Sequence, residues 1–236
     1  MIAERLNEVR EGIRRAALRA GRMTDDVRLM AVTKGVSANR IVEAVQAGQF
    51  LFGENYVQEC CAKIEEVRRL LADDTLFSRI EWHFIGHLQT NKAKLVAGRF
   101  HCLETLDSLE LARGLNRRCE AVGVHMNVLI QVNVGSDPAK SGISPATVQD
   151  FLRTFQPFSN LFVRGFMTIT PYSEDLNQVR LWYRALRHLR DRMQEEFNEL
   201  QLTELSMGMS HDFPVAVEEG ATIVRVGTAI FGARSK

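Results

Sequence analysis

Short apolar runs alternate with longer amphipathic stretches along almost the whole chain. The runs hold four to eight residues, as strands do, and the stretches between them carry apolar residues at helical spacing. This alternation is typical of repeated βα units around a parallel sheet. We predict eight strands, at residues 29–33, 50–53, 82–85, 100–103, 127–133, 162–169, 201–206 and 222–226.

The stretches between the strands predict helices, and one further helix precedes the first strand. Ile2, Leu6, Val9 and Ile13 recur at helical spacing with charged residues on the opposite face, so this first helix should pack on the core. Eight βα units favour a single (β/α)8 TIM barrel of the α/β class over an open doubly wound sheet. The later helices are predicted at residues 40–45, 57–71, 91–96, 109–121, 145–155, 177–200 and 213–219.

Composition narrows the choice of partner. The 236 residues, 45% of them hydrophobic, are enough for one sizeable core, and we expect residues 1–236 to form one domain. Lys and Arg number 30 against 29 for Asp and Glu, so no global field attracts nucleic acid or an anionic membrane. A small molecule is the expected partner. No stretch approaches a membrane span of about 18 apolar residues.

The cysteines and the N-terminus indicate a cytoplasmic protein. Cys60, Cys61, Cys102 and Cys119 show no C-x-x-C spacing, which favours reduced thiols over disulfides or redox chemistry. The first ten residues have no apolar signal region, and their Glu residues are unlike a transit peptide. We therefore expect a cytoplasmic location.

Chemically active side chains follow the predicted strands. In a TIM barrel the loops after the strands converge on one mouth, where the chemistry takes place. Residues far apart in the sequence are thus expected to face one pocket. They include Lys34, Asn55, Thr168, Ser210, Arg225, Gly227 and Thr228.

Lys34 ends the first strand and is followed at once by Gly35. A lysine is seldom buried without a partner, so an amine at the mouth of a buried strand costs free energy. Partial burial would lower its pKa and supply free amine, which attacks carbonyl groups to form a Schiff base. The alternative is a lysine whose ammonium group simply extends into water.

Two features near the C-terminus suggest a site for an anion and a ring. Gly227 and Thr228 follow the last strand and precede a short helical turn, and Ser210 in the loop before it could add a hydroxyl group. In TIM barrels these last loops often bind phosphate. Arg225 lies within the apolar last strand, so it either pairs with a barrel carboxylate or faces an acceptor on a bound ring.

Other candidates have ordinary explanations. Lys140, in a loop after the fifth strand, might accept an aldehyde, but a solvated loop lysine is the simpler interpretation. His83 and His87 straddle a strand end, and no further ligands nearby indicate a metal site. Met207 and Met209 are interpreted as pocket packing.

Several segments together carry a resemblance to a known family. The chain resembles the pyridoxal-phosphate homeostasis proteins, which are related to the N-terminal barrel of alanine racemase, and the match covers nearly its whole length. The segments are residues 31–34, 52–59, 82–92, 140–142, 165–169, 205–212 and 224–232.

The resemblance implies a barrel that holds pyridoxal 5′-phosphate (PLP) as a Schiff base on Lys34. It also implies Asn55 beside the cofactor and Arg225 at the pyridine nitrogen. The remaining implied contacts, to the phosphate, come from Ser210, Gly227 and Thr228. An arginine at that nitrogen would leave it largely unprotonated, so the cofactor would be a weak electron sink.

The implied role is vitamin B6 homeostasis, with effects on the balance of amino and keto acids and no established turnover. We therefore expect no catalytic residue, a monomer or weak dimer, and possible transfer of PLP to PLP-dependent apoenzymes. A weak amino-acid racemase is the alternative, but the sequence ends at Lys236 and Tyr56, Tyr172 and Tyr183 have no obvious role as its second base. A Schiff-base aldolase acting on sugar phosphates would leave Arg225 without a ring acceptor.

Overall fold

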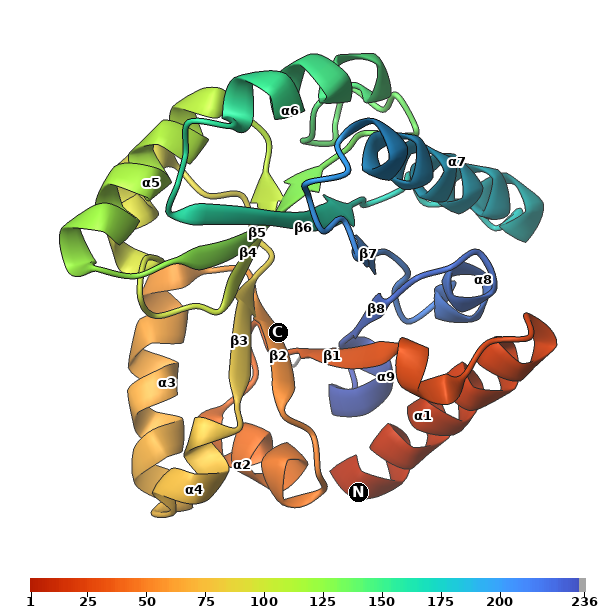
Figure 1. Cartoon of the computed structure of the whole chain (residues 1–236). Coiled ribbons are helices and arrows are strands. Elements are labelled where there is room, and N and C mark those ends of the chain that lie inside the picture. The colour runs from red at the N-terminus through yellow and green to blue at the C-terminus, as the bar shows by residue number, and fades with distance from the viewer. Residues whose placement is uncertain (234–236) are drawn as a thin grey trace.

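Eight parallel strands close into a barrel in the computed structural model, which describes residues 1–233. Each strand pairs with the next in the chain, and β8 pairs with β1. Figure 1 views the barrel from the end at which the strands begin, with the helices outside. The strands are β1 (Arg28–Val32), β2 (Leu51–Glu54), β3 (Glu81–Phe84), β4 (Cys102–Leu106), β5 (Met126–Gln131), β6 (Leu161–Met167), β7 (Glu204–Ser206) and β8 (Ile223–Val226).

The predicted TIM barrel with an extra N-terminal helix is confirmed. That helix, α1 (Ile2–Arg19), lies against α8 and α9 and buries the four apolar residues that predicted it. None of the described helices is long and apolar enough to cross a bilayer. The other helices are α2 (Ala38–Gln46), α3 (Val57–Leu71), α4 (Asp74–Ser78), α5 (Leu109–Val122), α6 (Val148–Phe155), α7 (Leu176–Glu196), α8 (Phe213–Glu218) and α9 (Thr228–Phe231), with 3-10 turns η1 (Thr24–Asp26), η2 (Thr90–Leu95) and η3 (Pro145–Thr147).

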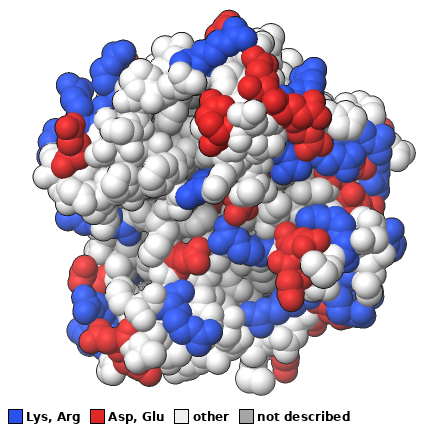
Figure 2. All heavy atoms as spheres, viewed as in Figure 1, with Lys and Arg blue, Asp and Glu red and all other residues white. Residues whose placement is uncertain are grey.

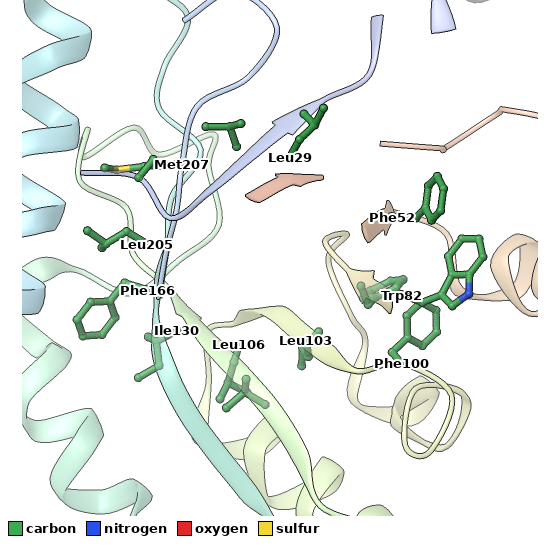
Figure 3. Packing of buried hydrophobic residues seen from close by; sticks show 14 of the residues in the cluster. Leu29, Phe52, Trp82, Phe100, Leu103, Leu106, Ile130, Phe166, Leu205 and Met207 are labelled. Carbon is green, nitrogen blue, oxygen red and sulfur yellow. The ribbon is translucent and has the colours of Figure 1, made fainter. Parts of the chain in front are cut away.

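The main core lies between the barrel and its helices. Successive strand side chains point to opposite faces of the sheet, so every second one meets the helices. Figure 3 shows this outer set, in which Phe52 and Trp82 pack with ring centroids 5.3 Å apart and Phe166 points away from the barrel axis. This layer holds most of the buried apolar residues.

The barrel interior is less uniform than this outer layer. One small apolar cluster contains Met30, Leu51, Ile85 and Ile223, and a second contains Cys102, Leu129 and Met167. Polar side chains occupy the space between them, and each is almost completely buried. These are His83, Glu104, Ser206 and Arg225.

Several predicted boundaries are wrong by a few residues. The fourth strand runs from Cys102 to Leu106 instead of 100–103, and the seventh begins at Glu204 instead of residue 201. The strands predicted at 127–133 and 162–169 each end two residues early. The helix predicted at 91–96 is the 3-10 turn η2, and α4 was not predicted. The domain predicted over 1–236 includes residues 234–236, which lie outside the described part.

Candidate functional site

A cavity of about 330 Å³ lies at the end of the barrel where the strands finish. Its lining comes from loops after β1, β2 and β7, from β8, and from α9. Thr168, which was also expected here, is buried outside this lining, and its carbonyl accepts a hydrogen bond from Arg225. The structure brings the other six predicted residues to this one cavity. They are Lys34, Asn55, Ser210, Arg225, Gly227 and Thr228.

Lys34 lies in the turn after β1 and is half-buried, as predicted from the sequence. Its neighbours on both sides are fixed by α3 and β2. Thr33 donates its hydroxyl hydrogen to Glu54 Oε1 at 2.7 Å, and the backbone N–H of Gly35 donates to Glu59 Oε1 at 3.0 Å. Lys63 of α3 joins these groups, because its Nζ donates to Glu54 Oε1 at 2.7 Å and Glu59 Oε1 at 2.8 Å.

This cluster of Thr33, Glu54, Glu59 and Lys63, the lysine-loop cluster, anchors the backbone that carries Lys34. Lys63 also donates to the Thr33 carbonyl at 2.8 Å, and its side chain is only 7% exposed. Burial raises the pKa of Glu54, and the positive charge of Lys63 opposes this effect. Glu54 Oε2 is buried without a hydrogen-bond partner among the described residues.

Asn55 reaches the cavity because two loops approach very closely. A Cβ atom on Gly86 would lie 2.1 Å from the Asn55 carbonyl oxygen, so only glycine fits there. The Asn55 side-chain oxygen is buried and has no hydrogen-bond partner among residues 1–233. An unpaired buried acceptor at a cavity wall is costly, and a ligand donor would satisfy it.

Arg225 points into the barrel from β8 and is 4% exposed. It donates to Ser206 Oγ and to the Thr168 carbonyl, both at 2.7 Å. Ser206 in turn donates to Glu104 Oε2 at 2.5 Å, and the Nδ1 atom of His83 lies 2.7 Å from Glu104 Oε1. Arg225 therefore reaches a barrel carboxylate through Ser206, and it also lines the cavity.

The charges along this row, from Arg225 through Ser206 and Glu104 to His83, stabilise one another. Burial by itself would raise the pKa of Glu104, but bonding and charge from His83, with Arg225 and Ser206, hold it below its usual value. Burial lowers the pKa of Arg225, and Glu104 opposes that effect. The guanidinium keeps its proton and presents only donors to the cavity.

The opposite side of the cavity supplies hydroxyl groups and backbone N–H groups. Ser210 follows β7, and Gly227 and Thr228 begin α9, whose first turn leaves N–H groups without helical partners. Gly208, in the loop after β7, makes room for α8, since a Cβ there would lie 2.5 Å from Ala216 Cβ.

The remaining candidates do not gather here. Lys140 is absent from the lining of this cavity. His83 is inside the barrel, whereas the side chain of His87 is 64% exposed, so the two do not share a site. Met209 lines the cavity, as the packing interpretation suggested, but Met207 packs in the outer core.

Sequence reasoning missed the residues that support the site. Lys63 lies within α3, Glu104 within β4 and Ser206 at the end of β7, and their partners come from other parts of the fold. Glu104 and Ser206 are separated by 102 residues. The available signal was a charged residue in an otherwise apolar strand, which Glu104 shares with Arg225.

The fold and the cavity define a barrel of the alanine racemase N-terminal class. The family model described as alanine racemase, N-terminal domain, matches residues 5–235. A solved alanine racemase of Clostridium difficile is similar with a TM-score of 0.68 at 14% identity, covering 100% of this chain and 57% of that one. At this low identity the likeness concerns the fold alone.

Nearer relatives specify the family. The pyridoxal phosphate homeostasis protein of Aquifex aeolicus is 43% identical over 231 residues, 98% of this chain and 97% of that protein. The structure of PipY from Synechococcus elongatus, solved with PLP bound, is 36% identical with a TM-score of 0.85, covering 98% and 100% of the two chains. This chain belongs to the family of pyridoxal phosphate homeostasis proteins.

Proposed function

We propose that this protein binds PLP as a Schiff base on Lys34 and acts in vitamin B6 homeostasis. The observation that carries the proposal is the convergence of a half-buried lysine, a buried arginine and two hydroxyl groups on one cavity. Family membership supports it, because the relatives carry the homeostasis name and PipY was solved with PLP.

The residues present fit this cofactor. A volume of about 330 Å³ lies within the range of small-ligand pockets. When bound, PLP supplies an aldehyde carbon that forms a covalent bond with an amine. We assign that amine to Lys34, and the unpaired acceptor of Asn55 to a donor on the ligand.

Arg225 is assigned to the pyridine nitrogen. Its guanidinium has only donors and is held in place by Ser206 and the Thr168 carbonyl. A donor keeps that nitrogen unprotonated, so the pocket gives little support to carbanion chemistry. The phosphate is assigned to the hydroxyls of Ser210 and Thr228 with the backbone at Gly227.

The positions of the tyrosines support a role without turnover. A two-base racemase needs a second acid–base group opposite the lysine. Among the described residues, no tyrosine lines the cavity, since Tyr56 and Tyr172 are 60% and 78% exposed and Tyr183 is buried elsewhere. We therefore propose a carrier that holds PLP and passes it to PLP-dependent apoenzymes.

The proposed setting is the cytoplasm, where a monomer or weak dimer would exchange PLP with other proteins. The support for a cytoplasmic setting comes from the cysteines. All four are free, and Cys60, Cys102 and Cys119 are buried. Reduced thiols of this kind are typical of a reducing compartment.

The test is the visible spectrum of purified protein supplied with PLP. We expect an absorption band that is lost in Lys34→Ala and kept in Lys140→Ala, the matched loop lysine that does not line the cavity. After borohydride reduction and digestion, the cofactor tag should lie on the peptide containing Lys34. A band and tag that persist in Lys34→Ala would refute the assignment, and robust alanine racemization would overturn the carrier role.

The phosphate contacts have a separate test. Ser210→Ala and Thr228→Val each remove a hydroxyl, and we expect PLP affinity to fall about three- to tenfold for each, as the loss of a hydrogen bond predicts. Equilibrium dialysis measures the affinity. Unchanged affinity in both variants would remove these residues from the site.

A further inference from the structure

A second cavity, the basal cavity, opens at the other end of the barrel, where the strands begin. Its volume is about 650 Å³. Figure 2 views this end, and it shows acidic and basic side chains gathered around a hollow near the centre of the face. The charged lining includes Arg28 of β1, Glu81 of β3 and Glu204 of β7, whereas Leu129 and Ile223 are apolar lining residues.

The two acidic residues of the basal cavity share one arginine. Arg28 donates to Glu81 Oε2 and to Glu204 Oε1, both at 3.1 Å. One arginine thus serves two carboxylates, and this trio carries one net negative charge. One further cation at the rim balances this charge, and a second leaves the lining positive.

Two more arginines line the basal cavity without a carboxylate partner. Arg79 lies over the Phe50 ring, 3.8 Å from its centroid. Arg164 donates only to the neutral side chains of Asn127 at 2.8 Å and Gln201 at 2.7 Å. Neither arginine forms an ion pair within residues 1–233, and the three arginines and two glutamates of the lining together carry a net charge of +1. Such a lining favours an anion.

His83 adds a buried polar group to the wall of the basal cavity. Its side chain is 5% exposed, and its Nδ1 atom is held by Glu104. The Nε2 atom has no hydrogen-bond partner among the described residues, since the nearest carboxylate oxygen, on Glu81, lies 3.8 Å away. A ring nitrogen at the cavity wall without a hydrogen-bond partner can bond to a ligand.

We propose that the basal cavity binds a small organic carboxylate with an apolar body. Arg79 and Arg164 attract the carboxylate, His83 Nε2 contacts the ligand, and the apolar surface of Leu129 and Ile223 accepts the rest of it. Arginine suits this role because its planar fork matches a carboxylate.

Binding there is coupled to the cofactor cavity at the other end. His83 belongs to both the basal cavity and the buried row of Glu104, Ser206 and Arg225, whose successive contacts measure 2.7, 2.5 and 2.7 Å. A ligand on Nε2 changes the polarity of the imidazole and hence the bond to Glu104, and the shift reaches Arg225 through Ser206. This coupling rests on the proposed function, whereas binding in the basal cavity does not.

Benzoate is the probe for binding, and benzamide is its uncharged counterpart. We expect benzoate, titrated into purified protein and followed by calorimetry, to bind at least about tenfold more tightly than benzamide. Arg79→Gln and Arg164→Gln should each weaken benzoate about tenfold, whereas Arg113→Gln, on the exposed outer face of α5, should not. Equal binding of the two probes, or equal effects of all three substitutions, would overturn the site.

The visible band of PLP-loaded protein tests the coupling. Benzoate should shift this band in the wild type but not in Arg79→Gln at the same concentration, and Ser206→Ala should bind benzoate without the shift. No shift in the wild type, or a full shift in Ser206→Ala, would overturn the coupling. If the protein holds no PLP, the proposed function fails, and the calorimetric titration still decides whether the basal cavity binds carboxylates.

Discussion

Glu54 and Glu104 are two fully buried carboxylates in one barrel, yet their pKa values move in opposite directions. Glu54 has a lysine at 2.7 Å, but both of its hydrogen bonds, from Lys63 and Thr33, go to Oε1, and its Oε2 has no partner within residues 1–233. Glu104 has a contact on each oxygen, from His83 and Ser206.

The difference teaches that a full positive charge nearby does not by itself hold the pKa of a buried carboxylate below its ordinary value. Burial raises the pKa of both carboxyl groups. The hydrogen bonds that each oxygen accepts determine how much of this rise is cancelled. The two residues also serve different ends of the site. Glu54 fixes the loop of Lys34, whereas Glu104 fixes Arg225 through Ser206.

The largest expected effect comes from removing the cation beside Glu54. Lys63→Met should lower the free energy of unfolding by about 3–5 kcal/mol, because it leaves a buried carboxylate without its partner. Urea unfolding followed by circular dichroism measures the loss. The exposed Lys94→Met is the matched control and should change stability by less than about 0.5 kcal/mol.

Removing both members of the pair sharpens this result. Glu54→Gln combined with Lys63→Met should recover at least about 1 kcal/mol of the loss, since no uncompensated charge remains. If the double variant loses as much stability as the two single variants lose together, the ion pair does not explain the effect.

A smaller loss is expected in the second network. Ser206→Ala removes the hydroxyl that joins Arg225 to Glu104 and should cost about 1–3 kcal/mol. It should also raise the pKa of Glu104, because one oxygen then loses its donor. Urea unfolding at neutral pH gives the cost, and Ser159→Ala, at an exposed position outside the cavity, is the matched serine control.

The smallest expected effect is the pH dependence of stability, and its sign is the most direct test of the comparison. The folded pKa of Glu104 is lowered, so its contribution to stability is present above the ordinary value of 4.5 and is lost as pH falls through the folded pKa. The folded pKa of Glu54 is raised, so its contribution is present below 4.5 and is lost as pH rises through the folded pKa.

The stability difference between the wild type and each glutamine variant isolates these contributions. Between acid and neutral pH, the free energy of unfolding of the wild type relative to Glu104→Gln should increase as pH rises. Relative to Glu54→Gln it should decrease as pH rises. Each slope is bounded by about 1.4 kcal/mol per pH unit, the limit for one titrating group. Slopes of the same sign would refute the contrast between the two carboxylates.

The barrel was predictable from the sequence because its outer layer follows a simple apolar pattern. Phe52, Trp82 and Phe166 face helices, and each lies in a predicted strand. The fourth strand was misplaced for a physical reason: Glu104 and Thr105 are polar, which suggested a loop, but both are buried within the strand.

The residues of the site could be predicted to a similar extent. Lys34, Asn55 and Arg225 could be found because each interrupts or ends an apolar run, and the structure places them on one cavity. Their supports could not be found in this way. The bonds that fix them join residues such as Glu104 and Ser206, whose proximity only the closed barrel creates.

The tethers on either side of Lys34 limit how this protein can release a ligand. Since Thr33 and Gly35 are both bonded to acidic side chains, the intervening amine moves chiefly by rotation about its own carbon chain. A molecule attached there would leave without any rearrangement of the surrounding backbone. The speed of handover to a recipient would then depend on how readily water or an amine of the recipient reaches the carbon bonded to the lysine nitrogen.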